Sequence, residues 1–214
     1  MPLSDRSLAL FDTPAPEFGQ PLPQKPSADM LEALFFRRSA SAPTLRAPGP
    51  SPEEMDLLIR LGLRVPDHGK IGPWRLVRFT PQSKTALVEK LKPLAVSQPE
   101  PAKALAALQK LAIPPEALLV VSSPLQPHKI PLWEQQLSAA AVCQTLLIAA
   151  GALGYGANWI TDWYSYDAVA KALLGLAEHE NVAGFIYLGT PSEAPLERDR
   201  PNFNERISYW TAGD

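Results

Sequence analysis

The segment Leu63-Arg64-Val65-Pro66-Asp67-His68-Gly69-Lys70-Ile71-Gly72-Pro73-Trp74-Arg75-Leu76-Val77 is the point around which this chain is organised. It begins where a helical pattern ends and finishes in a run typical of a strand, with two prolines, two glycines and a histidine between. Proline fixes φ and glycine admits backbone shapes closed to other residues, so a rigid loop is expected. Such loops often bind ligands, although an ordinary helix-to-strand connection has the same pattern.

A second basic cluster upstream favours a ligand site. A helix predicted over residues 28–38 carries an apolar stripe and delivers Arg37, Arg38, Ser39 and Ser41 at its C-terminal end. Arginine offers a planar fork that matches phosphate, so the cluster can form an anion site. Arginines also complement the dipole at a helix C-terminus, and alone the cluster favours that explanation. Together with the loop, it favours the anion site.

Length and composition restrict the class of protein. The 214 residues allow one large or two small domains, and 46% hydrophobic residues are ample for a core. A net charge of -2 argues against a nucleic-acid binder, and the lone Cys143 excludes an internal disulfide. The N-terminus shows no signal-peptide pattern, and the longest apolar helix is interrupted by Gln144. We therefore expect a cytoplasmic protein without a membrane span.

The periodicities predict a proline-rich, irregular arm over residues 1–27 and a single domain over 28–214. Serine, proline and glutamate at Ser51-Pro52-Glu53-Glu54 predict a capped helix start. The expected helices are 28–38, 51–63, 82–96, 101–111, 133–153 and 167–176. The expected strands are 74–80, 117–122 and 182–189, and residues 154–161 are expected to be a glycine turn that leads into a short strand. Residues 43–50 are expected to be a loop. The helix over 133–153 is apolar nearly all round, which predicts a core position and part of a subunit interface.

Several common sites are absent from the sequence. It contains no Gly-x-Ser-x-Gly elbow and no Walker loop. His68, His128 and His179 are far apart without ligand spacing, so no metal site is expected. The glycines of 154–156 can stop a helix or let backbone approach a planar ligand. Basic groups near both chain ends, a rigid loop and Trp159 together suit an anionic, partly aromatic ligand such as a phosphorylated flavin.

Taken jointly and in order, these motifs resemble the flavin-dependent nitroreductase family, most closely its compact bacterial members with Pro-Asp-His in this loop. The resemblance extends over residues 28–207 and leaves out the proline-rich arm. The motifs that carry it are Arg37-Arg38-Ser39, Pro66-Asp67-His68 to Pro73-Trp74-Arg75-Leu76, His128-Lys129-Ile130-Pro131 with Trp133-Glu134-Gln135, and the strand Gly184 to Pro191.

The resemblance implies an α+β fold, a three-layer sandwich in which helices flank a central, mainly antiparallel sheet. It implies an intertwined homodimer with two FMN molecules at the interface. It also implies a ping-pong oxidoreductase: NADH or NADPH reduces the flavin, and a nitroaromatic or quinone-like acceptor then takes the electrons in the same pocket. The flavin carries the redox step, so no side chain is singled out as catalytic.

By the same resemblance, Arg37 and Ser39 hold the cofactor, and Arg198 and Arg200 assist at its phosphate. Arg64 and His68 match loop positions that reach the flavin bound mainly by the other subunit. The backbone of 158–161 lies beside the flavin ring. The full implied FMN-binding set is Arg37, Arg38, Ser39, Ser41, Arg64, His68, Lys70, Asn158, Trp159, Ile160, Thr161, Gly189, Arg198 and Arg200.

The sequence departs from the family pattern at three positions. Many members have a basic residue where this chain has Ser41, and asparagine and glutamine where it has Lys70 and Gly72. Our hypothesis is that Lys70 supplies the positive charge that stabilises the reduced flavin. These departures leave two alternatives open: a dehalogenating or flavin-modifying enzyme on the same fold, and a flavin-binding protein without turnover.

Overall fold

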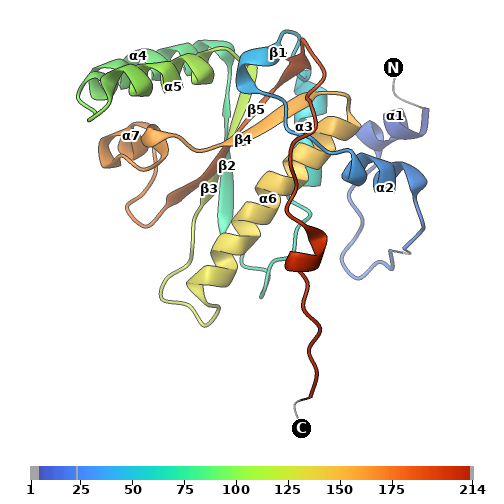
Figure 1. Cartoon of the computed structure of the whole chain (residues 1–214). Coiled ribbons are helices and arrows are strands. Elements are labelled where there is room, and N and C mark those ends of the chain that lie inside the picture. The colour runs from blue at the N-terminus through green and yellow to red at the C-terminus, as the bar shows by residue number, and fades with distance from the viewer. Residues whose placement is uncertain (1–4, 23, 213–214) are drawn as a thin grey trace.

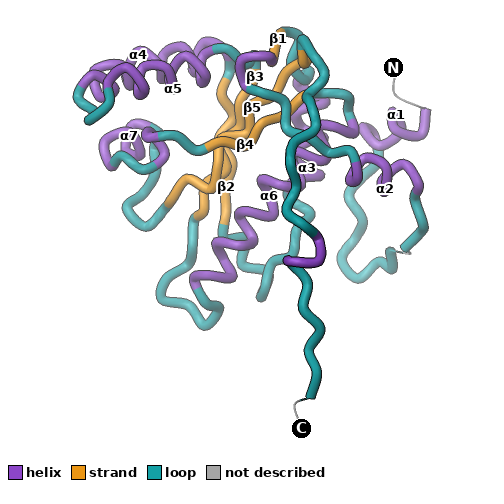
Figure 2. Tube along the Cα trace, viewed as in Figure 1, coloured by secondary structure: helices purple, strands orange, loops and turns teal. Residues whose placement is uncertain are grey.

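In the computed structural model, which describes residues 5–22 and 24–212, a five-stranded antiparallel sheet forms the centre of the domain (Figures 1 and 2). Its order is β1-β5-β3-β2, and β4 also pairs with β5. The strands are β1 (Leu45–Arg46), β2 (Trp74–Phe79), β3 (Glu116–Ser122), β4 (Gly156–Ile160) and β5 (Asn181–Pro191). β5 pairs with three of the other four strands, because its run of 11 residues is long enough to serve them all.

Helices cover both faces of this sheet. The helices are α1 (Asp5–Asp12), α2 (Ala28–Phe35), α3 (Pro52–Gly62), α4 (Pro81–Val96), α5 (Pro101–Ala112), α6 (Leu132–Ala152) and α7 (Ala168–Leu173). The α4–α5 pair lies over one face with α7, and α6 with α3 lies over the other (Figure 1). The expected α+β sandwich with an antiparallel sheet is confirmed. None of the described helices is both long and apolar enough to cross a bilayer.

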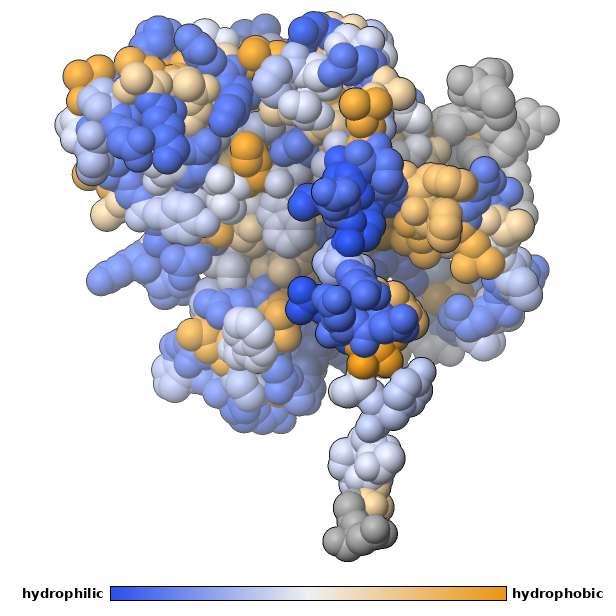
Figure 3. Space-filling view, viewed as in Figure 1, coloured by the Kyte–Doolittle hydropathy of each residue, from blue (hydrophilic) through white to orange (hydrophobic). Residues whose placement is uncertain are grey.

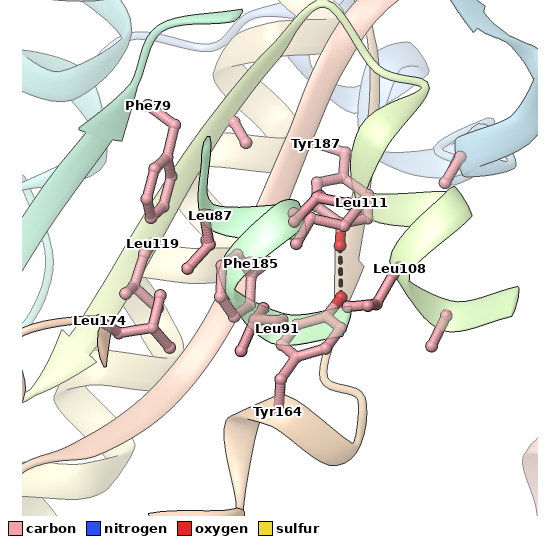
Figure 4. Close-up of a cluster of buried hydrophobic side chains, with 14 of the residues drawn as sticks. Phe79, Leu87, Leu91, Leu108, Leu111, Leu119, Tyr164, Leu174, Phe185 and Tyr187 are labelled. Carbon is pink, nitrogen blue, oxygen red and sulfur yellow. Dashed lines mark hydrogen bonds between the residues drawn. The ribbon is translucent and has the colours of Figure 1, made fainter. Parts of the chain in front are cut away.

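Two apolar clusters, one on each face, hold the layers together. The cluster under α4 and α5 includes Tyr164, Phe185 and Tyr187, whose rings meet edge-on or tilted (Figure 4). The hydroxyls of Tyr164 and Tyr187 lie 2.6 Å apart, so each buried polar group satisfies the other. The cluster under α6 includes Cys143, which is fully buried, and burial raises the pKa of its thiol to about 12. Cys143 is therefore a packing residue, as expected.

Local signals placed the main elements well. The Ser51 hydroxyl accepts from the Glu54 amide and the Glu54 carboxylate accepts from the Ser51 amide, so the predicted capped start of α3 is confirmed. The inner face of α6 is buried, including Val142 and Leu146, whereas Trp133 and Leu137 on its outer side stay exposed. The apolar residues of α6 therefore form two faces: one is buried in the core, and the other is exposed to solvent in the single chain.

Three predictions about local structure were wrong. The first helix ends at Phe35 rather than at residue 38, because Phe36 already has the non-helical φ of -94° and ψ of 5°. Residues 43–50 are not wholly a loop, since a 3₁₀ turn (Ala42–Thr44) and β1 lie there. The 1–27 arm is not irregular throughout, because it contains α1, and Arg60 of α3 donates to carbonyls at its end. Residues 1–4 and 23 of that arm lie outside the described part.

Candidate functional site

The arginine cluster after α2 meets the C-terminal segment. Arg38 donates from Nε to the Leu196 carbonyl (2.7 Å), and Arg200 donates from Nη2 to the Arg37 carbonyl (3.4 Å). Arg37 also donates from Nη1 to the Ser39 hydroxyl (3.3 Å). These contacts join segments about 160 residues apart, and they bring four predicted site residues together.

A polar pocket of about 540 Å³ lies between these two segments. It contains the Arg38 guanidinium and several hydroxyl groups, which are the donors that a phosphate requires. Its lining residues are Arg38, Ser39, Ser41, Thr44, Glu193, Ala194, Pro195, Leu196 and Glu197. An apolar pocket of about 400 Å³ shares Arg38 and Pro195 with it and extends between α2 and the end of α6.

The carboxylate of Glu197 forms ion pairs with two arginines at this pocket, Arg38 and Arg200. Its carboxylate lies 3.0 Å from Arg200 Nη2 and 3.8 Å from Arg38 Nε. The Arg198 amide, followed by the Arg200 side chain, lowers the pKa of Glu197 from its ordinary value. The Glu197 side chain is 61% exposed, so it can turn into solvent when another anion takes its place. The side chain of Arg198 has no hydrogen bond within the described residues.

β4 fastens the cluster to the sheet. Asn158 donates from Nδ2 to the Ala40 carbonyl (2.6 Å), and the Ala40 amide donates to the Ala157 carbonyl (3.0 Å). Farther along, the Trp159 indole donates to the Ala183 carbonyl (3.0 Å) and remains 38% exposed. Ile160 packs on the α4 side of the sheet.

Two further predicted residues have structural partners of their own. Thr161 accepts a hydrogen bond from the Tyr166 hydroxyl at 2.9 Å. Gly189 is buried, and a Cβ there would lie 2.8 Å from Pro115 and 2.9 Å from the Arg46 carbonyl. The need for glycine at 189 therefore follows from close packing within the sheet.

The Arg64–Gly72 loop is tied to α6. The Ser138 hydroxyl donates to the Pro66 carbonyl (2.8 Å) and accepts from the Trp74 indole (3.1 Å). The Asp67 carboxylate accepts from the Gly72 amide (2.8 Å), which closes the loop. Lys70 takes a positive φ of 55°, a shape that disfavours most side chains, so this turn is tightly constrained.

The predicted site residues of this loop face two different neighbours. His68 contacts the first turn of α6, where its Nδ1 lies 2.6 Å from Oε2 of Glu134. The Lys70 ammonium lies 4.8 Å from the ring centre of Phe18 in the arm. Arg64 lines an apolar pocket of about 500 Å³ between α3 and the arm.

In one chain, the two halves of the predicted site lie apart. His68 contacts Glu134 at the start of α6. The apolar pocket that contains Arg38 is lined by Gly151 at the end of α6. Gly151 lies 17 positions after Glu134, which is about 25 Å at a helical rise of 1.5 Å per residue. The structure therefore leaves His68 at the other end of the helix, while Arg64 and Lys70 face the arm. The predicted residues that it gathers are Arg37, Arg38, Ser39, Ser41, Asn158 and Arg200.

Sequence reasoning missed some members of both halves. Glu197 and Thr44 line the polar pocket, and Glu134 pairs with His68. Tyr155 donates to Glu54 (2.6 Å) beside the apolar pocket, and burial followed by that hydrogen bond raises its pKa to about 12. Glu134 and Tyr155 have partners 66 and 101 residues away in the sequence, where no local pattern points to them.

The model of the Nitroreductase family matches residues 34–190 of this chain. The chain belongs to the Nitroreductase family. It is 32% identical over 184 residues to an Escherichia coli K12 protein named "Putative NAD(P)H nitroreductase YdjA", and this match covers 85% of the chain and 100% of the relative.

Solved structures of the nitroreductase fold agree. A nitroreductase-like protein of Bacillus cereus superposes with a TM-score of 0.75 at 19% identity, over 87% of this chain and 98% of that one. A Bacteroides fragilis nitroreductase with bound FMN superposes with a TM-score of 0.66 at 18% identity, over 86% and 100%. The α1 arm and the segment carrying Arg198 and Arg200 lie outside the family match.

Proposed function

We propose that this nitroreductase-family chain is an FMN-dependent oxidoreductase that uses NADH or NADPH to reduce nitroaromatic or quinone-like acceptors by a ping-pong mechanism. The observation that carries the proposal is a pocket lined by Arg38 and several hydroxyl groups, with Arg37 and Arg200 beside it, within this fold. The name of the Escherichia coli relative and the FMN in the Bacteroides fragilis structure support the cofactor and donor.

The residues around the pocket fit a phosphate group. Arg38, Ser39, Ser41 and Thr44 offer charged and hydroxyl donors, and Arg37 lies beside them. Glu197 now holds two of the arginines at an exposed surface, so a phosphate can replace it without leaving a buried charge unpaired. When bound, FMN supplies the redox chemistry, and the protein supplies binding, orientation and charge.

A second copy of the chain would complete the site. His68 contacts the end of α6 opposite to the arginine cluster, about 25 Å away along the helix, too far to share its ligand within one chain. Two α6 helices packed antiparallel on their exposed faces would place the loop of one chain next to the arginines of the other. The exposed Trp133 and Leu137 on that face support a homodimer with FMN at the interface.

Alternating use of one pocket follows from this arrangement. A planar nicotinamide and a planar acceptor need the same open face of the flavin, so the first must leave before the second enters. The side chains of this chain would then serve to orient both and to keep positive charge near the ring, where Lys70 and Arg64 contribute.

The visible spectrum of the purified protein tests cofactor binding directly. The parent should be yellow, with a flavin released by heat that is identified as FMN. Arg37→Ala should retain at least tenfold less FMN, because it loses a charge-assisted phosphate contact worth about 1.5–3 kcal/mol. Arg78→Ala is the matched control, since Arg78 lies exposed at the end of β2, away from the pocket. Equal FMN content in the two variants would refute the assignment of Arg37.

Steady-state kinetics test the reaction. NADH or NADPH oxidation should depend on an added nitroaromatic or quinone, with parallel double-reciprocal lines when donor and acceptor are varied together. A yellow protein that oxidises neither donor with any acceptor would instead be a flavin-binding protein without turnover.

A further inference from the structure

The contact between His68 and Glu134 is a short hydrogen bond between two elements that lie far apart in the sequence. His68 lies in the loop after α3, and Glu134 lies in the first turn of α6. Nδ1 of His68 and Oε2 of Glu134 are 2.6 Å apart, and a carboxylate can only accept, so Nδ1 carries the hydrogen. Ser138, one turn farther along α6, holds the same loop through the Pro66 carbonyl. The geometry of the pair is therefore set at two points.

We propose that Glu134 is a positioning residue that fixes His68 in the Nδ1–H form and presents its Nε2 to the electron acceptor as the proton donor for the acceptor's reduction. The proposal rests on the proposed function. The His68 side chain is 65% exposed, and its Nε2 has no hydrogen-bond partner among the described residues. Nε2 is therefore available to a ligand that docks against this loop.

The charged groups near His68 are two carboxylates and the cations of the neighbouring segments. Glu134 and Asp67 line the same small pocket as His68, and Oδ1 of Asp67 is buried without a partner among the described residues. Lys70 and Arg64 are the cations of the loop itself, and Lys129 is that of the segment before α6. Lys70 is directed toward the Phe18 ring. Carboxylates are thus the charges that contact the ring most closely.

A proton donor at this place answers a requirement of the chemistry. A quinone receives two electrons and one proton as a hydride, and it needs one further proton to leave as the hydroquinone. The hydrogen on Nε2 of the His68 imidazolium supplies that proton, while the Nδ1–H bond to Glu134 is kept. The neutral imidazole then regains its proton from solvent. Reduction of the flavin by the nicotinamide requires no proton from His68.

The same chain contains an internal reference for the tautomer. His128 accepts at Nδ1 from the Ile130 amide (3.1 Å), so its neutral ring must carry hydrogen on Nε2. His68 and His128 are therefore expected to be opposite tautomers in one spectrum.

Nitrogen-15 NMR of the histidine-labelled protein tests the positioning role. Above the titration of the rings, His68 should give the Nδ1–H pattern and His128 the Nε2–H pattern. Glu134→Ala should convert His68 to mainly Nε2–H and leave His128 unchanged. Glu53→Ala is the matched control, since Glu53 is also a first-turn glutamate, in α3. An Nε2–H pattern for His68 in the parent would overturn the proposal whether or not the protein binds FMN.

Stopped-flow kinetics test the proton transfer. Each variant is first loaded to the FMN content of the parent, and its own rate of reduction by NADH or NADPH is the reference against which its reoxidation is compared. Reoxidation by a quinone should slow by about 10²-fold or more in His68→Gln, the usual contribution of a general acid, and by about tenfold in Glu134→Ala. Reoxidation at the parent rate in His68→Gln would overturn the proposal. Absence of FMN from the parent would refute the proposed function instead.

Discussion

At residue 184 the absence of a side chain determines where the indole of Trp159 can lie. A Cβ on Gly184 would overlap the Trp159 ring, whose Nε1 donates to the neighbouring Ala183 carbonyl. Gly184 and Trp159 lie on paired strands, and the ring crosses the sheet on the side of α6. The glycine therefore fixes the one partly exposed aromatic side chain of β4.

We expect Gly184→Ala to destabilise the protein by about 1–3 kcal/mol, because the indole must leave its position or the strands must separate. Urea unfolding measures the loss, and a change in tryptophan emission shows that the ring has moved. Gly151→Ala is the matched control: an added Cβ in this helical position meets nothing within 4 Å, so stability should be unchanged or slightly higher. An unchanged emission spectrum in Gly184→Ala would contradict this account of the ring.

Glu180 makes stability depend on pH in the acid range. It accepts from Arg75 at both carboxylate oxygens (2.7 Å each) and from the Ala177 amide. The Arg75 hydrogen bonds are the main reason why its pKa falls from 4.5 to about 2. A lowered pKa stabilises the fold above the unfolded value, and this stability is lost as pH falls from about 4.5 to 2.

Arg75 is half-exposed, so solvent screens its ion pair with Glu180. We therefore expect the pair to contribute about 1–2 kcal/mol to the free energy of unfolding at neutral pH. Between pH 6 and pH 3, the parent should lose more free energy of unfolding than Glu180→Gln, as measured by urea titration. Glu178→Gln, an exposed neighbour, should follow the parent. Parallel pH curves for Glu180→Gln and the parent would show that the pair has no such role.

Among the elements, α1 is held to the body mainly through one side chain. Arg60 of α3 donates to the carbonyls of Leu10, Phe11 and Thr13 at distances of 3.1–3.4 Å. These carbonyls lie at the C-terminal end of α1, where unpaired acceptors and the helix dipole favour a cation.

Replacing Arg60 with alanine should release α1, because three hydrogen bonds to a charged donor disappear together. The loss of these bonds should lower the free energy of local opening by about 1–2 kcal/mol in total. Amide exchange of residues 5–16 should therefore rise about 5- to 30-fold, as measured by hydrogen–deuterium exchange with mass spectrometry. Arg78→Ala should leave that peptide unchanged. Unaltered exchange in Arg60→Ala would mean that apolar contacts alone hold the arm.

For the assembled protein, the exposed apolar side chains predict a partner surface. Trp133 and Leu137 of α6 are 67% and 48% exposed, and Leu31 and Phe35 of α2 are 70% and 79% exposed. Apolar side chains gather over α2 in the space-filling view, and the C-terminal segment extends away from the body (Figures 1 and 3). Exposed apolar side chains in such number are typical of a partner surface.

We expect the parent to sediment as a dimer and Leu137→Glu to sediment as a monomer, because a buried unpaired carboxylate at the interface costs several kcal/mol. Under the proposed dimer, the variant should also lose FMN, because the loop of the second chain would no longer reach the cofactor. Val96→Glu places the same charge at an exposed position of α4 on the other side of the sheet and should remain dimeric. A dimeric Leu137→Glu would place the interface elsewhere.

The order of helices and strands was readable from the chain because the signals are local. The caps at Ser51, the apolar run of β3 and the periodicity of α6 act within one or two turns. The motif order also pointed to the nitroreductase family, which the comparison with known proteins confirms. β1 escaped prediction because two residues form no pattern, and their pairing depends on where β5 ends.

The contacts of the candidate site were settled by the packed chain alone. Arg38 reaches Leu196 across 158 positions, and His68 reaches Glu134 across 66. No period or cap encodes such pairs, since they form only when the sheet register and the crossing of α6 bring distant backbone together. The separation of Arg38 from His68 along α6 has the same origin: the resemblance assigned His68 to the flavin bound mainly by the other subunit, and within one chain a helix of 21 residues lies between the two side chains.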